Sequence, residues 1–214
     1  MKKIIITLLA ISMPIFINAQ TSGLFSKKKI RMQKDVTEYM AGAVPEVDGK
    51  VEFKTVISAP GKSKAEIISA LSSWANLRFT PEQARGEWTD ANFFKNLEYA
   101  KITELDKNSG NISIQGAEEM VFSSKTLAKD YTHIYYIIKL NISEGSVAFN
   151  MNNISYVYVG ASENPQRIKA EEWINDKNAF NKKGELHRQT GKFRVKTIDL
   201  KDQLIKEITE AVTK

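Results

Sequence analysis

The chain lacks cysteine altogether, which excludes thiol catalysis, zinc–thiolate sites, iron–sulfur clusters and a lipidated N-terminal cysteine. Histidine occurs twice in 214 residues, so a histidine-rich metal site or a phosphorelay is not favoured. Proline (five) and glycine (eleven) are scarce, which excludes collagen-like and low-complexity sequences. What remains is a globular composition, 42% hydrophobic and 26% charged, long enough for one sizeable domain.

Motifs that carry common chemistry are also missing. No GxSxG, HExxH, P-loop or GxGxxG pattern occurs in the chain. His133 and His187 have no carboxylate or nucleophile at a suitable local spacing. The neighbouring carboxylates Glu118-Glu119 and Glu171-Glu172 diverge in a strand or a helix, so neither pair is an acid–base couple. The sequence therefore predicts no catalytic, cofactor-binding or metal-binding residue.

Positive charge is concentrated in the first 34 residues. The whole chain has 31 Lys and Arg against 25 Asp and Glu. From Asp35 onward, 24 basic residues stand against all 25 acidic ones, a net charge of −1. A nucleic-acid-binding domain carries its positive charge on the folded surface. The sequence therefore predicts no nucleic-acid partner.

The first 19 residues have the order of a secretory signal peptide. A lysine pair precedes an apolar run from Ile4 to Ile11, Pro14 interrupts the segment, and the small residue Ala19 suits a cleavage site. The run is too short for a membrane anchor, and no later stretch is apolar enough for a transmembrane segment. We expect export to the periplasm or cell envelope, a basic spacer over residues 20–38, and a single domain over residues 39–214.

Local patterns predict a strand and a helix at the start of this domain. Residues 51–57 alternate between apolar and polar, which predicts a half-buried strand. Ser63 and Glu66 form the pattern Ser-x-x-Glu of a capping box, which predicts a helix over residues 63–78. The stripe expected to pack against a sheet comprises Ile67, Leu71, Trp74 and Arg78.

A meander of strands follows this helix. Strands are predicted over residues 99–105, 112–114, 120–122, 131–142 and 147–158. After Asn152-Asn153 the apolar residues change parity, which indicates a β-bulge that curves the sheet. The triplet Asn-Ile-Ser occurs at Asn111, Asn141 and Asn153, and we interpret it as strand patterning with the isoleucines facing the core.

The C-terminal part is expected to be helical. Residues 170–174 predict a short helix, followed by a loop up to Gly191. Asp199 is a suitable N-cap for a final helix whose apolar stripe includes Leu204 and Ile208. The resulting order, β-α-β-β-β-β-α, predicts an α+β protein of two layers.

One loop region combines an aromatic side chain with cations. Trp173, Lys177, Arg188 and Lys192 together are predicted to bind an anionic or sugar-like ligand. The alternative is that Trp173 packs in the core, where large aromatic side chains are usually found.

Four longer phrases carry a resemblance to a known family. They are YMAGAVPEVDGKVEF (39–53), PGKSKAEI (60–67), AEEWINDKNAFNKK (170–183) and GKFRVKTIDLKDQL (191–204). On these phrases the chain resembles, from about Tyr39 onward, the secreted Bacteroidota proteins catalogued as domain of unknown function 4468. The resemblance implies a TATA-binding-protein-like fold, a curved antiparallel sheet with helices on one face. It brings no activity or site residue, and the name of a fold does not imply DNA binding.

Two functions from different classes follow. The first is an exported, non-enzymatic module that binds an envelope protein or glycan through the curved sheet, without a cofactor. The alternative is a hydrolase of an envelope polymer that uses carboxylates placed by the fold. The oligomeric state is not predicted.

Overall fold

The structure is a computed structural model that describes residues 36–79, 94–96, 100–125, 128–158 and 167–214. The chain divides into two units, Met1–Lys34 and Asp35–Lys214, and all described residues belong to the second. Its strands are β1 (Glu46–Val47), β2 (Lys50–Val51), β3 (Phe53–Ser58), β4 (Phe94–Asn96), β5 (Lys101–Asp106), β6 (Asn111–Lys125), β7 (Ala128–Ser143), β8 (Ser146–Tyr158) and β9 (Arg167–Lys169). Its helices are η1 (Val36–Tyr39), α1 (Lys64–Phe79), α2 (Ala170–Trp173), α3 (Asp176–Ala179) and α4 (Thr190–Thr213).

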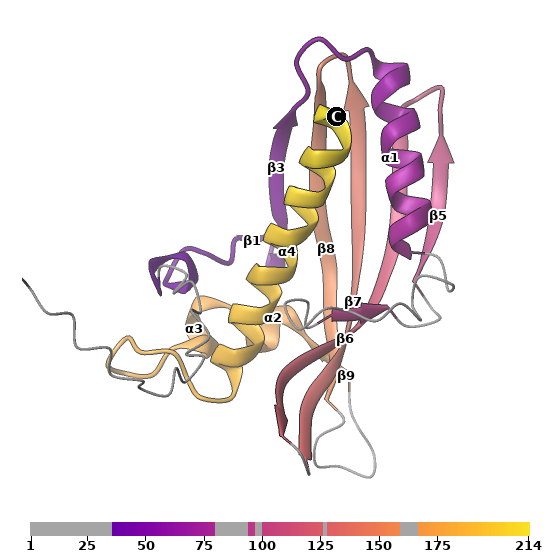
Figure 1. Cartoon of the computed structure of the whole chain (residues 1–214). Helices are drawn as coiled ribbons and strands as arrows, with labels where there is room; N and C mark the ends of the chain where they lie inside the picture. Colours follow the sequence, from indigo (N-terminus) through magenta and orange to yellow (C-terminus); the bar gives the residue numbers. More distant parts are fainter. Residues whose placement is uncertain (1–35, 80–93, 97–99, 126–127, 159–166) are drawn as a thin grey trace, which may run out of the picture. The chain divides into compact units, whose positions relative to one another are not determined.

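An antiparallel sheet of seven strands forms one layer of this unit. The strands run in the order β3-β8-β7-β6-β4, while β5 pairs with β6 and β9 pairs with β8. The helices α1 and α4 contact each other and lie against one face of the sheet (Figure 1). The predicted class, an α+β fold with a curved antiparallel sheet and helices on one face, is confirmed.

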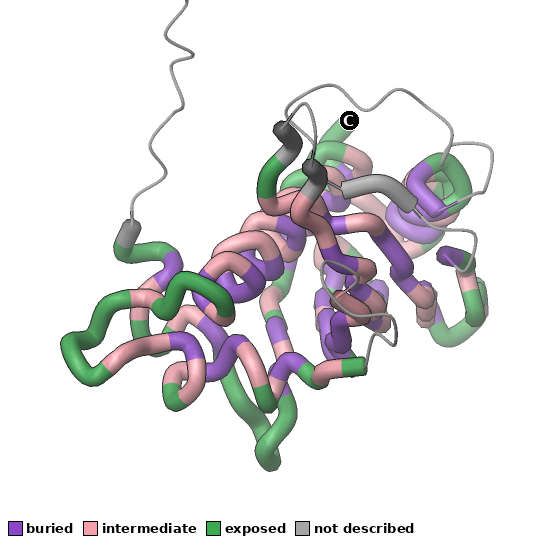
Figure 2. The backbone as a smooth tube through the Cα atoms, turned by 90° about the horizontal axis from the view of Figure 1, so that it is seen from below, coloured by how far each residue is buried: buried purple, intermediate pink, exposed green. Residues whose placement is uncertain are grey.

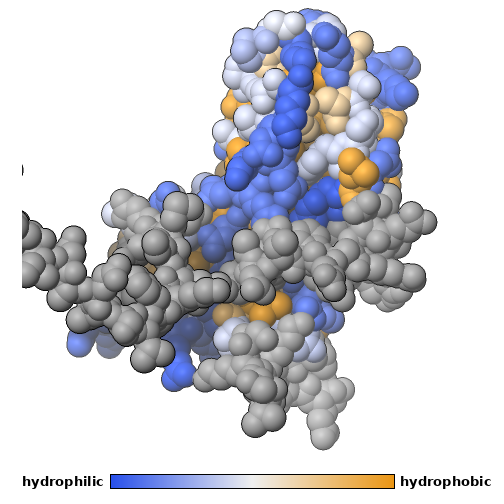
Figure 3. All heavy atoms as spheres, in the orientation of Figure 1, coloured by the Kyte–Doolittle hydropathy of each residue, from blue (hydrophilic) through white to orange (hydrophobic). Residues whose placement is uncertain are grey.

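The alternating pattern of the strands determines which face of the sheet is buried. Within the strand predicted over residues 131–142, the alternate residues that share one face of β7 are all buried, namely Thr132, Ile134, Tyr136, Ile138, Leu140 and Ile142. The residues between them are half-buried or exposed. Buried positions gather where the helices face the sheet (Figure 2), whereas hydrophilic side chains run along the outward side of the helix layer (Figure 3). The core therefore lies between the two layers, and the opposite face of the sheet carries the polar residues.

A bulge in β8 produces the predicted change of parity. Tyr135 of β7 pairs with Ser155, but Ile137 pairs with Asn152, so β8 has one extra residue between these pairs. Asn153 lies in this bulge with a φ of 51°, a left-handed conformation that asparagine tolerates better than most residues. Such bulges bend a strand and increase its local twist.

The start of α1 is confirmed, but its packing differs from the prediction. The hydroxyl of Ser63 donates to Glu66 Oε2 at 2.6 Å, and the Glu66 N–H donates to Ser63 Oγ at 3.3 Å. The bond from the Ser63 hydroxyl, followed by the bond from the Ser63 backbone N–H to Glu66 Oε2 at 2.8 Å, lowers the pKa of Glu66. Leu71 is buried, but Trp74 is only half-buried and its indole N–H donates to Glu207 of α4 at 3.2 Å. The prediction that Trp74 is buried against the sheet is therefore wrong.

The final helix begins at Thr190 and not at Asp199, as the sequence suggested. Gln189 occupies the N-cap without a side-chain hydrogen bond, so no local signal marks the true start. Gly191, the expected end of a loop, lies in the first turn, where a Cβ would approach the Leu186 Cβ to 2.9 Å. Asp199 lies inside the helix and accepts a hydrogen bond from the Tyr39 hydroxyl at 2.8 Å.

Three further boundaries differ from the expected ones. Glu52 separates β2 from β3, so residues 51–57 do not form one strand. The apolar residues at 112–114 and 120–122 belong to the single long strand β6. The loop expected before Gly191 contains α3. The sequence of residues 81–96 has no clear period and predicts a long loop with a short helix; Phe94–Asn96 instead form β4, and residues 81–93 lie outside the described residues.

Candidate functional site

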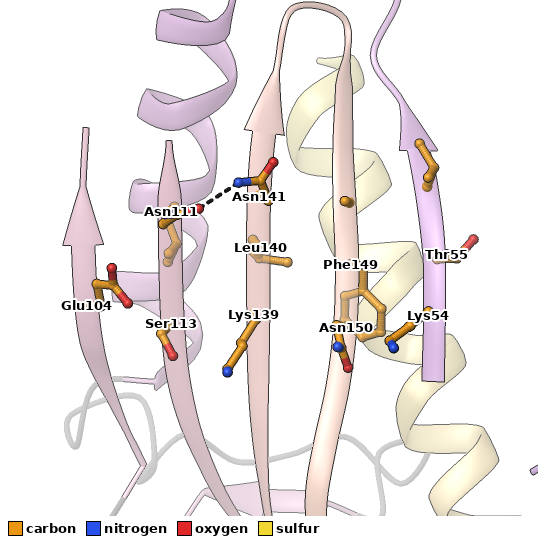
Figure 4. A pocket seen from close by; sticks show the side chains of 13 residues that line it. Lys54, Thr55, Glu104, Asn111, Ser113, Lys139, Leu140, Asn141, Phe149 and Asn150 are labelled. Carbon is orange, nitrogen blue, oxygen red and sulfur yellow. Dashed lines mark hydrogen bonds between the residues drawn. The ribbon is translucent and has the colours of Figure 1, made fainter. Parts of the chain in front are cut away.

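The face of the sheet opposite the helices contains a groove of about 610 Å³. Residues of β3, β5, β6, β7 and β8 line it, and α1 and α4 lie behind it in the close view of Figure 4. Because successive residues of a strand point to opposite faces, the groove receives the residues that alternate with the core positions. The same alternation that buries the core therefore places polar side chains here.

A transverse row of polar side chains crosses the groove. The strand register pairs Glu104 with Ser113, Ser113 with Lys139, Lys139 with Asn150, and Asn150 with Lys54. Figure 4 shows these five side chains next to one another across the strands. Neighbouring strands are about 4.8 Å apart, so the backbones of Lys139 and Lys54, two strands apart, are separated by about 10 Å.

A second row runs parallel to the first. Asn111 pairs with Asn141, Asn141 with Ala148, and Ala148 with Val56. The Asn141 amide donates to the Asn111 side-chain oxygen at 2.7 Å (Figure 4). The isoleucines that follow Asn111, Asn141 and Asn153 are all buried, which confirms our interpretation of the Asn-Ile-Ser triplets. Val56 is 71% exposed and adds an apolar side chain to the rim.

The charges of the groove are unequal. Lys54 forms an ion pair with Glu52, and its side chain remains 53% exposed. Lys139 is exposed and has no ion pair among the residues that the structure describes. Glu104 is the single carboxylate among the described residues of the lining. The lining thus offers amides, hydroxyls and two ammonium groups against one carboxylate.

A smaller hollow of about 470 Å³ adjoins the groove on the same face. Gln115 and Ile137 line it, each two residues along its strand from Ser113 and Lys139 of the transverse row. Arg167 of β9 donates to Ser155 Oγ at 2.7 Å, and its guanidinium lies over the ring of Tyr135, 4.3 Å from the ring centroid. The bulge residue Asn153 also lines this hollow.

The four residues predicted to bind a ligand do not all come together. Arg188 and Lys192 line a hollow of about 570 Å³ together with Asp130, Tyr158 and His187. Trp173 instead packs against Phe193, with ring centroids 5.7 Å apart, and is half-buried. Lys177 is exposed on α3. The packing interpretation of Trp173 therefore agrees with its surroundings.

Lys192 interacts with groups of the protein itself. Its Nζ donates to Asp130 Oδ2 at 2.7 Å and to the Tyr158 hydroxyl at 3.1 Å. It also lies 4.4 Å from the ring centroid of Phe122 and 4.7 Å from that of Tyr158. The Lys192 ammonium is therefore engaged by a carboxylate, a hydroxyl and two aromatic rings of the protein itself.

A buried ionic network connects the two layers. Arg78 Nη2 donates to both oxygens of Glu118 at 3.0 Å, and the Tyr136 hydroxyl donates to Glu118 Oε1. Arg78 Nε also donates to Glu207 at 3.2 Å. Burial lowers the pKa of Arg78, but Glu118, Tyr136 and Glu207 outweigh this effect and raise it above the usual range. Burial, followed by Glu118, raises the pKa of Tyr136 well above its usual value. The hydrogen bonds among these groups join the helices α1 and α4 to the strands β6 and β7.

The remaining candidates for chemistry are dispersed. His133 is half-buried beside Tyr131, with ring centroids 5.8 Å apart, and His187 is exposed at the hollow of Arg188. Glu171 accepts a hydrogen bond from the Val51 N–H at 3.1 Å, while Glu172 is exposed. Over the described ranges, no group of three His, Asp or Glu residues is placed to hold a metal ion.

Comparison with known proteins identifies the family. The family described as "Domain of unknown function (DUF4468) with TBP-like fold" matches residues 53–157. The solved structure of a DUF4468 family protein from Bacteroides ovatus is 33% identical to the chain, with a TM-score of 0.70. That match covers 84% of this chain and 96% of the other. This chain belongs to the DUF4468 family. No curated protein matches it.

Membership in the DUF4468 family confirms the resemblance seen in the sequence and the TBP-like fold. A TBP-like protein from Parabacteroides distasonis has the same fold at 20% identity, with a TM-score of 0.62 and coverage of 79% of this chain and 96% of the other. All residues that line the groove lie within the segment that matches the family. None of the helices in the described part of the chain has the length and apolar character needed to cross a membrane.

Proposed function

We propose that this DUF4468 protein is an exported, non-enzymatic binding module that holds a partner in the periplasm or cell envelope. The partner binds to the open face of the curved sheet. The observation that supports this function is the groove of about 610 Å³, which lies on the face opposite α1 and α4. Its volume is within the range of small-ligand sites, roughly 300–1,000 Å³.

The construction of the groove favours binding. Its polar side chains project from five strands that are held together by antiparallel backbone pairing. Sites built on regular elements hold their side chains more accurately than sites on loops. The ionic network of Arg78, Glu118 and Tyr136 stiffens the sheet from behind. The result is a preformed surface, which lowers the entropic cost of binding.

The hydrolase alternative has no comparable support. Glycosidase chemistry needs two carboxylates on either side of the scissile bond. Among the described residues, Glu104 alone supplies a carboxylate to the groove lining, and the buried Glu118 is engaged by Arg78 and Tyr136. We therefore retain binding as the proposed activity.

Cell fractionation tests the proposed localisation. The full chain, expressed in a Bacteroides host, should be recovered from the periplasmic or envelope fraction with Gln20 as its first residue. Mass spectrometry of the intact protein in each cell fraction identifies the fraction that contains it and its first residue. Full-length protein that begins at Met1 in the cytoplasm would contradict export.

Binding through the groove is tested by filling it. Ala148 is exposed in the groove, so Ala148→Trp should fill the space without disturbing the core. Ala65 is exposed in the first turn of α1, and Ala65→Trp adds the same bulk to the helix layer as a control. The purified mature proteins are incubated with insoluble Bacteroides envelope material and sedimented.

We expect the parent and Ala65→Trp to sediment with this material and Ala148→Trp to remain in solution. Prior digestion of the material with protease separates a protein partner from a glycan. Equal sedimentation of all three proteins, or sedimentation of none, would overturn the proposed function.

A further inference from the structure

We propose that the groove binds an acidic polysaccharide, a polymer of sugars that carry carboxylate groups. This inference rests on the proposed function and specifies its ligand. It is carried by the two rows of side chains that cross the groove, since their chemistry matches both features of such a polymer, its hydroxyls and its negative charges.

The hydroxyl groups of a sugar are matched by the uncharged side chains. Each hydroxyl both donates and accepts hydrogen bonds, and a side-chain amide also offers both a donor and an acceptor. Asn111, Asn141 and Asn150 present three amides to the groove, and Ser113 adds a hydroxyl. The exposed Val56 and the half-buried Ile137 add apolar surface for the C–H faces of the rings.

The carboxylates of the polymer are matched by the cations of the open face. Lys54 and Lys139 lie on either side of Asn150 in the transverse row, and Arg167 lines the adjoining hollow. Against these three cations the two linings contain one carboxylate, that of Glu104, and Glu52 beside the groove forms an ion pair with Lys54. The chain from Asp35 onward has a net charge of −1, so the residues of these two linings are positive relative to the rest of the domain.

The position of the cations favours an extended ligand. The hollow of Arg167 continues the groove along β6 and β7. The Arg167 guanidinium lies over Tyr135, which is four residues from Lys139 on β7, a backbone separation of about 13 Å. A chain of several acidic sugars could place one carboxylate at the transverse row and another at the hollow.

The experiment measures binding of short galacturonate oligomers to the mature protein by isothermal titration calorimetry. The matched ligand is the same oligomer with its carboxylates methyl-esterified, which keeps the sugar and removes the charge. Lys139→Gln removes the groove ammonium that forms no ion pair with another described residue. Lys206→Gln makes the same change on α4, where the side chain is 77% exposed, and serves as the control.

We expect the charged oligomer to bind and the methyl ester to bind about tenfold more weakly, with a similar loss for Lys139→Gln, because a charge-assisted hydrogen bond is removed in each case. Lys206→Gln should bind like the parent protein. Thermal melting of both variants verifies that they are folded.

Four outcomes would overturn the inference. Equal binding of the acid and its ester would show that the groove does not recognise the carboxylate charge. Equal weakening by Lys206→Gln would indicate non-specific attraction, and full competition by duplex DNA would indicate a general polyanion surface. If no oligomer binds while Ala148→Trp still abolishes sedimentation, the acidic polysaccharide is rejected and the proposed function stands.

Discussion

The ring of Tyr136 lies directly over Gly116 of the neighbouring strand. The two residues are register partners on β7 and β6, and a Cβ at position 116 would lie 2.1 Å from the Tyr136 ring. The missing side chain lets the ring cross β6 toward Glu118, two residues farther along the strand, where its hydroxyl donates to the carboxylate. A glycine in a central strand is usually unfavourable. Here it makes space for the aromatic member of the buried network.

The first prediction is that Gly116→Ala destabilises the protein by about 1–3 kcal/mol, because the added methyl group overpacks the core. Tyr136 would have to move, and its bond to Glu118 would be strained. Urea unfolding measures the free energy. In a Tyr136→Leu background, which lacks the contacting ring atoms, the same glycine substitution should cost much less. An equal cost in both backgrounds would show that the ring is not the cause.

The second prediction concerns alkaline pH. Burial raises the pKa of Tyr136, with a further rise from Glu118, and burial also raises that of Tyr156. In the unfolded chain both phenols lose their protons above about pH 10, whereas in the folded protein they retain them. The unfolded state is therefore favoured as the pH rises, and each tyrosine should remove up to about 1.4 kcal/mol of stability per pH unit above that point.

This pH dependence is measured by urea unfolding between pH 8 and pH 11. The unfolding free energy should fall less steeply with rising pH in Tyr136→Phe and in Tyr156→Phe than in the parent protein, whatever the effect of each substitution at neutral pH. The slope is the informative quantity, because the loss of a hydrogen bond shifts the whole curve without changing its slope. A slope equal to that of the parent in both variants would contradict the assignment.

The third prediction concerns Arg194, which is fully buried in α4. Its guanidinium donates to the carbonyl oxygens of Tyr39 and Met40 at 2.7 and 2.6 Å and to that of Ile174 at 2.7 Å. It also forms an ion pair with Asp176. Three of the phrases that resemble the family therefore meet at one side chain. Lysine cannot reproduce this set of donors, because it lacks the planar fork of the guanidinium.

We expect Arg194→Lys to loosen residues 36–44 selectively, since their attachment depends on the Tyr39 and Met40 carbonyls. Hydrogen–deuterium exchange measures this, with faster exchange expected there and little change in β7. Arg188→Lys is the matched control, because Arg188 is exposed. Uniformly faster exchange throughout the domain would instead indicate a global loss of stability.

Local patterns were sufficient for much of the fold. The alternation on β7 and the capping box of Ser63 and Glu66 depend on neighbours in sequence, and both are confirmed. The start of α4 was missed because Gln189 provides no cap, and Gly191 is required by its approach to Leu186 and not by a turn. A close contact of this kind leaves no periodic signal in the sequence.

The candidate site was less predictable, because it depends on pairing between distant residues. Lys192 was expected to face a ligand, but Asp130, 62 positions away in the sequence, lies beside it. The transverse row was missed for a similar reason. Glu104, Ser113, Lys139, Asn150 and Lys54 become neighbours only through the register of four strand pairs. The sequence could indicate the open face of each strand, but not which side chains meet across it.

The last prediction is that the domain does not bind duplex DNA tightly. Affinity for DNA comes largely from neutralising phosphates and releasing counterions. From Asp35 onward, 24 basic residues stand against 25 acidic ones, so the domain has no positive excess. The groove contributes two lysines, and one of them, Lys54, is paired with Glu52. A TBP-like fold therefore does not bring the electrostatic attraction that DNA binding requires.

Fluorescence anisotropy with labelled duplex DNA at physiological salt tests this prediction. Protein beginning at Gln20 is compared with a shortened protein beginning at Asp35. The shortened protein should show no binding, because its net charge is −1, whereas residues 20–34 carry five basic residues and no acidic one. Any binding by the longer protein should therefore be weak and should decrease steeply as salt is added. Tight binding by the shortened protein would contradict the prediction, and its loss in Lys139→Gln would assign it to the open face of the sheet.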